Sequence, residues 1–352
     1  MNDGSRLEPF LGDLVAGDAA RAAVALVGDA RGVRSVHAVG TSSDARFDLA
    51  SLTKPFVATL ALVLHQAGEL RLDSPLGQVW RRSEASLGPP LEACALELLL
   101  RHRSGLAPWA PLYALAKTPE RALPLLLAGK LVEPAPAGVA YSDLGYVLWG
   151  LTAAESLGAP VEELLERNVS EPLGLTSLGL GRRRPLPGAG GEIVVTSPMD
   201  TAKEVVLAAA RGLTIELLPP PEPGQPQDGN TRFLGGVPGH AGLFGTARDV
   251  WRLGAVWLRA LRGEESLLPS DLVRRALGGT GPFALGWARA SLDGSSGPEL
   301  SGTAFGHVGF TGTSLWIDPE RDRIAVLLAA RTSPLDDFNR HRRSLHDLVF
   351  RG

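Results

Sequence analysis

Cysteine and lysine are both scarce in this chain of 352 residues. Its single cysteine, Cys94, excludes an internal disulfide and any metal site built from several cysteines. The seven histidines are scattered, without an HExxH pattern or another metal-ligand spacing, so we expect no bound metal. A formal net charge of -3, with no basic stripe interleaved with aromatic residues, gives no electrostatic reason to expect a nucleic-acid partner.

Long apolar runs and a leader-like N-terminus are also missing. No uninterrupted apolar run approaches the roughly 18 residues that a membrane-spanning helix needs, so we expect no membrane partner. The opening residues, MNDGSRLEPFLGDLVAGDAA, lack the basic and apolar regions of a secretory signal. We therefore expect a cytoplasmic location, or a periplasmic one if a leader has been removed. The apolar content of 44% and charged content of 21% are ordinary for a globular protein.

Strand patterns lie at the two ends of the chain. Residues 22–29 and 34–40 are short apolar segments separated by a glycine-containing turn, which predicts a hairpin. Near the other end, residues 305–331 predict strand, turn and strand, with DPERD as the turn. Residues 47–70 carry apolar side chains on nearly every face and have Gly68 as a stop, which is typical of a buried helix.

Between these regions, the helical segments are short and broken by proline and glycine. Strands from both termini with helices between them predict one α/β (α+β) domain over residues 1–352. Its first lobe is an antiparallel β-sheet flanked by helices, built from residues 1–70 and 231–352. Its second lobe is a mainly helical insertion over residues 71–230, and we expect the active site in the cleft between the lobes.

The stretch DLASLTKPF places Ser51 and Lys54 three residues apart at the expected start of the buried helix. Free N–H groups and the positive end of the helix dipole would favour negative charge developing at Ser51. Both side chains project from one helix face, and burial of Lys54 would lower its pKa and supply a neutral amine as a base. Alternatively, Ser51 caps the helix and Lys54 is a solvated cation.

Two further stretches carry candidate site residues. YSD at 141–143 precedes an apolar helix, so Tyr141 could act as a base or as a proton relay between a nucleophile and a leaving group. His307 lies in FGHVGFTG, where glycines allow the backbone to approach a ligand closely. The alternatives are structural: a packed tyrosine, an N-cap at Ser142 or Asp143, and a hydrogen-bonded histidine.

Together, SLTK at 51–54, YSD at 141–143 and HVG at 307–309 resemble the three motifs of the serine β-lactamase and penicillin-binding protein family. Those motifs are Ser-x-x-Lys, Tyr-x-Asn and Lys/His-x-Gly. The resemblance is to the branch that contains class C β-lactamases, D,D-peptidases and related esterases, and it covers most of the chain. It implies the fold of that family, in which an antiparallel sheet with flanking helices carries a helical lobe.

The resemblance also implies a role for each motif residue. Ser51 would attack a carbonyl and form an acyl-enzyme, while Lys54 and Tyr141 would share the proton transfers. The backbone N–H groups of Ser51 and Phe310 would form the oxyanion hole. Three more residues would contact the substrate, namely Asp143, His307 and Gly309. No cofactor is implied.

Two of these positions depart from the family pattern. Asp143 stands where asparagine is usual, and an ionised carboxylate accepts hydrogen bonds but cannot donate them. Near Lys54 it would raise the pKa of the ammonium, so our hypothesis is that Tyr141 carries more of the base role. His307 stands where relatives often carry lysine, and a neutral imidazole attracts a substrate carboxylate less strongly. We therefore expect weak β-lactam turnover and better activity on small esters or other amides.

The predicted function is that of a serine hydrolase that cleaves ester or amide bonds in small molecules or peptides through an acyl-enzyme. Two alternatives remain open. One is a D,D-carboxypeptidase or penicillin-binding protein that acts on peptidoglycan peptides. The other is a catalytically silent ligand-binding or scaffold protein on the same fold. The sequence leaves the natural acyl group, the leaving group and the oligomeric state open.

Several other residues have structural interpretations. We interpret His102 and His240 as hydrogen-bonded structural histidines, and Cys94 as a core residue. The run RHRR at 340–343 is interpreted as solvated surface. Four tryptophans are expected in the core or in the wall of the cleft: Trp109, Trp149, Trp287 and Trp316.

Overall fold

The computed structural model describes residues 4–80, 88–133, 140–182, 192–196, 201–216, 218–291 and 294–351. Its main sheet has six strands in the order β2-β1-β8-β7-β6-β5, and each neighbouring pair is antiparallel. The strands are β1 (Ala20–Gly28), β2 (Val33–Val39), β5 (Ala288–Arg289), β6 (Phe305–Val308), β7 (Ser314–Asp318) and β8 (Arg323–Arg331). A separate small sheet pairs β3 (Phe47–Asp48) with β4 (Phe244–Gly245).

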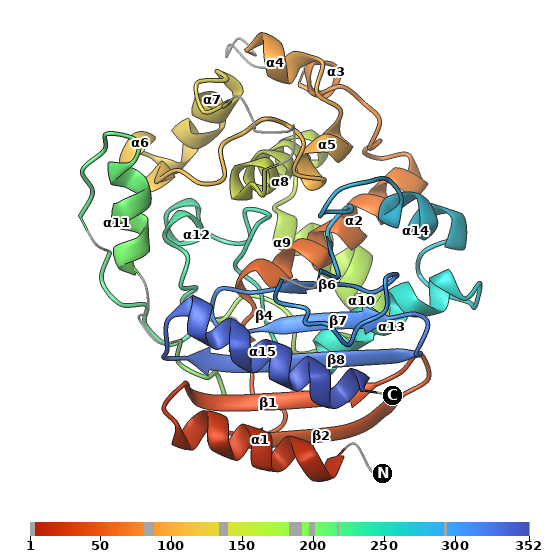
Figure 1. The fold of residues 1–352 in the computed structure, drawn as a ribbon. Coiled ribbons are helices and arrows are strands. Elements are labelled where there is room, and N and C mark those ends of the chain that lie inside the picture. Colours follow the sequence, from red (N-terminus) through yellow and green to blue (C-terminus); the bar gives the residue numbers. More distant parts are fainter. Residues whose placement is uncertain are drawn as a thin grey trace.

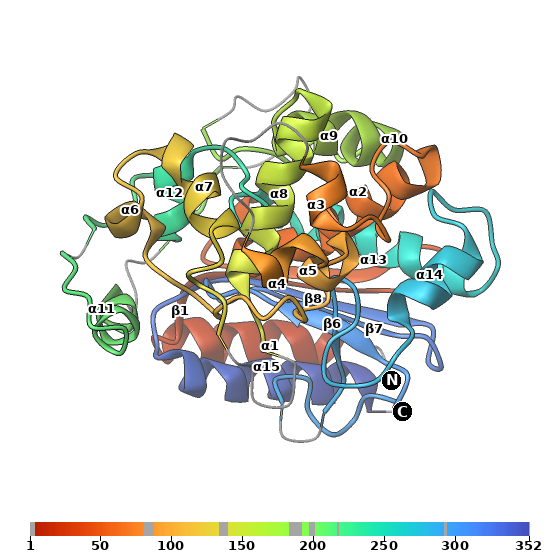
Figure 2. The ribbon, with the colours of Figure 1, turned by 90° about the horizontal axis from the view of Figure 1, so that it is seen from above.

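Helices cover both faces of the main sheet (Figure 1). On one face, α1 (Gly4–Ala16) and α15 (Leu335–Phe350) lie side by side, as Figure 2 shows. On the other face, α13 (Ala247–Leu261) packs against β1, β7 and β8. Because both faces are covered, β1 and β8 are almost entirely buried, which explains why they read as continuous apolar runs. Each side of the sheet thus has its own apolar cluster.

Most of the remaining helices form a second layer above the sheet (Figure 1). The longest are α2 (Thr53–Ala67) and α8 (Asp143–Leu157). The others are α3 (Leu76–Val79), α4 (Pro89–Glu92), α5 (Leu96–Leu100), α6 (Leu112–Leu115), η2 (Pro119–Arg121), α7 (Ala122–Leu127), α9 (Val161–Leu165), η4 (Glu166–Ser170), α10 (Glu171–Leu173), α11 (Thr201–Ala209), α12 (Gly229–Leu234) and α14 (Ser270–Leu277). A single turn, η1 (Ala50–Leu52), connects β3 to α2.

The predicted fold class and the strands at both ends are confirmed. The N-terminal hairpin is β1–β2, and the C-terminal strand pair is β7–β8. Asp318 starts the predicted DPERD turn by accepting the N–H groups of Glu320 and Arg321 at 3.1 and 3.2 Å. Gly68 ends α2 in the left-handed conformation, with φ of 74°. The predicted helix starts later than residue 47, because Phe47 and Asp48 pair with β4.

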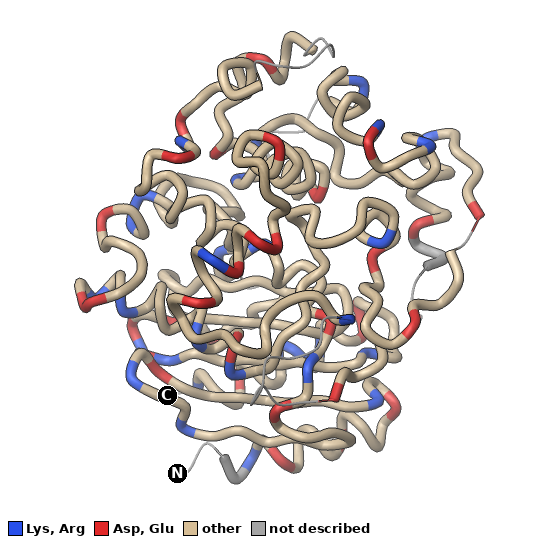
Figure 3. The backbone as a smooth tube through the Cα atoms, turned by 180° about the vertical axis from the view of Figure 1, so that it is seen from behind, with Lys and Arg blue, Asp and Glu red and all other residues tan. Residues whose placement is uncertain are grey.

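The lobe boundaries at residues 71 and 230 remain a prediction. Within the described residues, no helix is both long and apolar enough to cross a bilayer. Basic and acidic positions are interspersed along the described chain in the view of Figure 3. Cys94, Trp149, Trp287 and Trp316 are buried, as expected for core residues.

A buried histidine makes the fold sensitive to acid. His346 on α15 is fully buried, and its Nδ1 lies 2.9 Å from the carbonyl oxygen of Ser296. Burial lowers the pKa of His346 to about 3. The unfolded chain therefore takes up a proton near pH 6.5 that the native state takes up only near pH 3, so stability is lost as pH falls through this window.

We predict that His346→Asn weakens this pH dependence, because an amide can still donate to the Ser296 carbonyl but does not titrate. The free energy of unfolding in urea should fall between pH 7.5 and pH 4.5 by about 2 to 3 kcal/mol less in the variant than in the parent. Equal losses in the two proteins would contradict a neutral His346.

Candidate active site

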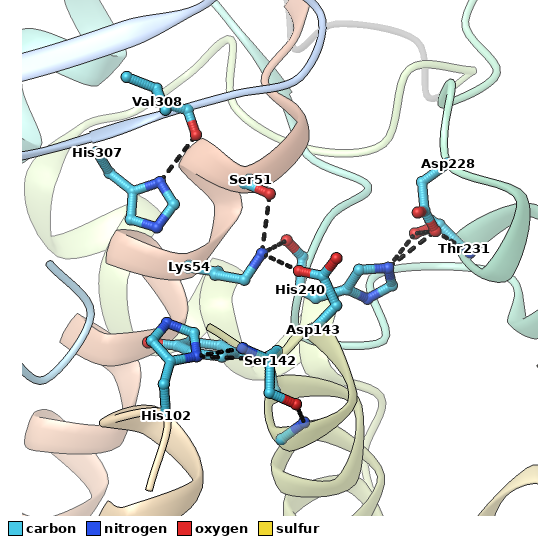
Figure 4. Close-up of polar contacts among 12 residues, drawn as sticks. Ser51, Lys54, His102, Ser142, Asp143, Asp228, Thr231, His240, His307 and Val308 are labelled. Carbon is cyan, nitrogen blue, oxygen red and sulfur yellow. Dashed lines mark hydrogen bonds and ion pairs between the residues drawn. The ribbon is translucent and has the colours of Figure 1, made fainter. Parts of the chain in front are cut away.

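Ser51 lies in the turn η1, directly before α2 (Figure 4). The preceding residue, Ala50, has φ of 47°, a left-handed conformation that costs a non-glycine residue about 1 kcal/mol or more. Neither η1 nor α2 has a side-chain N-cap, and Lys54 is fully buried. The alternative in which Ser51 caps the helix and Lys54 is solvated is therefore wrong.

The Lys54 ammonium has three acceptors from three parts of the chain (Figure 4). Its Nζ donates to Ser51 Oγ at 2.9 Å and to the carbonyl oxygen of His240 at 3.1 Å, and it pairs with Asp143 Oδ1 at 2.7 Å. Burial alone would lower the pKa of Lys54, but Asp143 and Tyr141 outweigh it and the pKa is raised. The expected neutral amine is thus wrong, whereas the expected effect of Asp143 is confirmed.

Tyr141 lies beside this ammonium, with Lys54 Nζ 5.1 Å from the centre of its ring. Burial raises the pKa of Tyr141. The charge of Lys54 and hydrogen bonds with Lys54 and Ser51 oppose this rise only in part. The ring of His102 lies 4.5 Å from that of Tyr141, and His102 Nδ1 accepts the N–H of Ser142 at 3.0 Å. His102 is therefore the hydrogen-bonded structural histidine that the sequence predicted, and it orders the segment that carries Tyr141.

The end of β6 approaches the Ser51 turn very closely. A Cβ atom on Gly309 would lie 2.5 Å from the carbonyl oxygen of Leu49 and 2.1 Å from Thr313 Oγ1, so only glycine fits. Phe310 follows this contact, and its carbonyl oxygen accepts a hydrogen bond from Arg331 Nε at 2.9 Å. The chain thus brings the Phe310 segment next to the candidate nucleophile.

His307 on β6 is buried, and its ring centre lies 6.0 Å from that of Tyr141. Burial, together with the charges of Lys54 and Arg342, lowers the pKa of His307 to about 3, so the imidazole is neutral at neutral pH. It lines a cavity of about 200 Å³ with Phe283 and Trp316. Tyr141 also lines that cavity, which lies beside the larger cavity at Ser51.

The larger cavity has a volume of about 600 Å³. Its walls include five of the predicted site residues, namely Ser51, Tyr141, Asp143, Gly309 and Phe310. Trp109 also lines this cavity, and the wall of the cleft is one of the two locations predicted for it. The wall also contains charged or polar residues that the sequence did not mark as site residues: Glu204, Asp228, His240, Asn339, Arg342 and Arg343. Among the described residues, no group of three or more His, Cys, Asp or Glu side chains is arranged to hold a metal ion.

Arg342 corrects the interpretation of RHRR as solvated surface. Its side chain is fully buried, and it donates from Nη1 to Asn339 Oδ1 at 2.7 Å and from Nη2 to the carbonyl oxygens of Gly309 and Thr313. Burial, with the nearby charge of Arg331, lowers the pKa of Arg342 to about 9. This guanidinium remains mostly charged at neutral pH and has carbonyl and amide oxygens, not carboxylates, as its hydrogen-bond acceptors in the described structure. The helical spacing of residues in α15 does not tell which face of that helix lies toward the cavity, so the position of Arg342 could not be predicted from it.

Buried His240 pairs with half-buried Asp228, and both residues line the larger cavity. His240 Nε2 lies 2.8 Å from Asp228 Oδ1, and the same carboxylate caps α12 by accepting the N–H of Thr231 at 2.6 Å. Burial would raise the pKa of Asp228, but His240 and these hydrogen bonds outweigh it and lower it. His240 is therefore a hydrogen-bonded structural residue, as predicted, and its carbonyl oxygen also helps to hold Lys54.

Ser51 is hydrogen-bonded to a buried lysine, lies beside a tyrosine, and is located between a sheet and a helical layer. This arrangement is typical of the class of proteins that transfer acyl groups through a serine. The sequence profile of the Beta-lactamase family matches residues 10–350, and the chain belongs to this family. The predicted family resemblance is thereby confirmed.

Curated relatives carry several activities in their names. The chain is 30% identical over 212 residues to the N-acetylmuramyl-L-alanine amidase of Bacillus subtilis (strain 168), covering 56% of this chain and 45% of the relative. It is 28% identical to Esterase EstB of Burkholderia gladioli, covering 82% and 78%. A protein of Escherichia coli (strain K12) named as a D-alanyl-D-alanine carboxypeptidase is 29% identical, covering 56% and 46%. The match thus spans less than half of the amidase and of the carboxypeptidase.

Solved structures share the fold. EstCE1, described as a hydrolase with promiscuous acyltransferase activity, superposes with a TM-score of 0.71 at 19% identity and 97% coverage of both chains. The octameric penicillin-binding protein homologue from Pyrococcus abyssi gives 0.70 at 18% identity, covering 97% of this chain and 76% of that one. At these identities the likeness concerns the fold alone.

We predict that Asp143→Asn shifts the pH dependence of Ser51 reactivity. Loss of the carboxylate should lower the pKa of Lys54, so the ammonium is lost at a lower pH. If Tyr141 carries the base role beside a charged Lys54, the alkaline fall in the rate of fluorophosphonate labelling should move to lower pH.

The matched control is Asp13→Asn, an exposed change on α1 that should leave the profile unaltered. A higher labelling rate of Asp143→Asn at neutral pH would instead identify neutral Lys54 as the base. An unchanged profile would exclude any effect of Asp143 on the proton transfers.

Proposed function

We propose that this protein is a serine hydrolase that cleaves small esters or amides through an acyl-enzyme on Ser51. One observation carries the proposal: Ser51 Oγ accepts a hydrogen bond from the buried Lys54 ammonium, beside Tyr141, at the wall of a cavity of about 600 Å³. The family and the names of its esterase, amidase and carboxypeptidase relatives support the same chemistry. Esters and amides of small molecules or peptides are the proposed substrates.

The proton transfers are best described as a relay. The raised pKa values of Lys54 and Tyr141 mean that both groups carry their protons in the free protein. As Ser51 Oγ attacks the carbonyl carbon, the Tyr141 oxygen accepts the seryl proton while its own proton passes to the leaving group. Lys54 stabilises the negative charge that develops during this exchange. Water then enters by the reverse route and releases the acid.

The carbonyl oxygen becomes negative in this step and needs donors. In our proposal these are the backbone N–H groups of Ser51 and Phe310, and loss of one such donor typically costs about 10² to 10³ in rate. Asp143, His307 and Gly309 are the proposed substrate contacts. Weak β-lactam turnover is also part of the proposal, because a carboxylate at position 143 cannot donate to the amide carbonyl of a β-lactam side chain.

Intact mass spectrometry tests the nucleophile. The parent should gain one adduct from a fluorophosphonate and release p-nitrophenol from p-nitrophenyl butyrate, and Ser51→Ala should do neither, because Lys54 and Tyr141 have no nucleophile to serve. Absence of labelling and of turnover in the folded parent would favour the silent ligand-binding alternative. Efficient hydrolysis of a cephalosporin would contradict weak β-lactam turnover.

A second candidate function, a carboxypeptidase that acts on D-alanyl peptides, is favoured by Arg342. His307 is neutral, but Arg342 supplies a buried cation in the wall of the larger cavity. A substrate carboxylate that reached it would form a charge-assisted hydrogen bond. The carboxypeptidase name of one relative is consistent with this alternative.

Matched peptides separate the two candidates. For N-acetyl-D-alanyl-D-alanine and its C-terminal amide, a carboxypeptidase should favour the free carboxylate by about tenfold or more in kcat/KM, as expected for a gain of about 1.4 kcal/mol. Equal, slow turnover of both peptides with rapid turnover of p-nitrophenyl butyrate would favour the esterase.

A further inference from the structure

We propose that Asp48 is a positioning residue, which holds the Ser51 turn and the Phe310 segment together so that their backbone N–H groups converge on one carbonyl oxygen. This inference rests on the proposed acyl-enzyme function. Asp48 belongs to β3, three residues before Ser51, and is 2% exposed. It is not among the residues that line the cavity, so it would act through its neighbours.

The side chain of Asp48 holds the nucleophile turn. Its Oδ1 accepts the N–H of Ala50 at 2.9 Å. Ala50 is the residue with φ of 47°, and Ser51 follows it directly. A left-handed alanine persists only where its surroundings enforce it, and the Asp48 carboxylate is the side chain that binds its N–H. The direction of the Ser51 N–H depends on this conformation.

The backbone of Asp48 holds the other side of the site. Its carbonyl oxygen accepts a hydrogen bond from Thr311 Oγ1 at 2.7 Å, and Thr311 is the residue after Phe310. The next carbonyl oxygen, on Leu49, accepts Thr313 Oγ1 at 3.1 Å. Two threonine hydroxyls therefore bind the β6–β7 connection to the strand that leads into Ser51. The close approach at Gly309 makes this contact possible.

The second carboxylate oxygen reaches a third segment. Asp48 Oδ2 accepts the N–H of Gln227 at 2.7 Å, and the adjacent Asp228 pairs with His240. The carbonyl oxygen of His240 in turn accepts a hydrogen bond from Lys54. Asp48 thus contacts the nucleophile turn and the Phe310 segment directly, and it reaches the His240 loop through Gln227 and Asp228.

The chemistry of Asp48 is unusual for a residue with only a packing role. Burial raises the pKa of Asp48 to about 6, against the two backbone N–H groups that favour its charge, and nearby Asp228 raises it further. In the described structure its carboxylate is bound by N–H groups and by no cation. A buried carboxylate without a cation is costly, and here it supplies acceptors for two segments at once.

Asp48→Asn tests the proposal, because the amide preserves size but offers an N–H₂ group where a backbone N–H needs an acceptor. The expected result with p-nitrophenyl butyrate is a fall in kcat of about tenfold to a hundredfold, less than the loss of a whole oxyanion donor would give. KM should change by less than about twofold, because misplaced donors weaken the transition state more than the bound substrate.

Thr311 provides an independent test on the other side. Thr311→Val removes the hydroxyl that binds the Asp48 carbonyl oxygen and should lower kcat by about threefold to tenfold, whereas Thr311→Ser, which keeps the hydroxyl, should restore it. This pair keeps the proposal testable if Asp48→Asn fails to fold.

The matched control is Asp318→Asn. Asp318 is also a fully buried carboxylate, it accepts Ser301 Oγ at 2.8 Å and the Ser301 N–H at 2.9 Å, and it does not line the cavity. This variant should lose stability and keep the kcat of the parent. A kcat loss as large as that of Asp48→Asn would mean that any buried carboxylate matters equally, and would overturn the positioning role.

The outcomes also separate this inference from the proposed function. An active parent whose kcat is unchanged in both Asp48→Asn and Thr311→Val would overturn the positioning role and leave the hydrolase intact. A fall confined to KM would overturn it as well. A parent that neither hydrolyses the ester nor reacts with the fluorophosphonate would overturn the proposed function and this inference with it.

Discussion

The site depends on one buried ammonium. Taking the Lys54 charge out of water is costly, and the cost is offset only because its Nζ has acceptors in Ser51, His240 and Asp143. These acceptors come from the turn η1, the loop that contains His240 and the start of α8, so the ammonium holds three segments around the nucleophile. Of these acceptors, Asp143 raises the pKa of Lys54 together with nearby Tyr141, and the amine stays protonated. Its charge is therefore a property of the assembled cleft.

A second buried cation connects the C-terminal helix to the site. Arg342 on α15 binds the carbonyl oxygens of Gly309 and Thr313, on either side of Phe310. Lys54 is paired with a carboxylate, whereas the described hydrogen-bond acceptors of Arg342 are amide and carbonyl oxygens. The two cations thus do different work. One is the charge next to Ser51, and the other ties α15 to the backbone beside Phe310.

Features that depend on neighbours along the chain were predictable from the sequence. The β1–β2 and β7–β8 pairs follow from local apolar patterns and their turns, and the contact of Ser51 with Lys54 follows from helical spacing. The burial of Arg342 was not predictable, because four basic residues on a helix most often face water. The raised pKa of Lys54 was predictable only as a conditional statement about Asp143.

The sequence by itself determined the family, the order of the three motifs and the class of fold, because these depend on residue types at set spacings. Only the tertiary structure decided the charge of Lys54, the location of His307 beside the main cavity and the contacts of Asp48 with Gln227 and Thr311. The physical reason is that burial and charge interactions depend on distances between atoms. Those distances join residues that lie far apart in the chain.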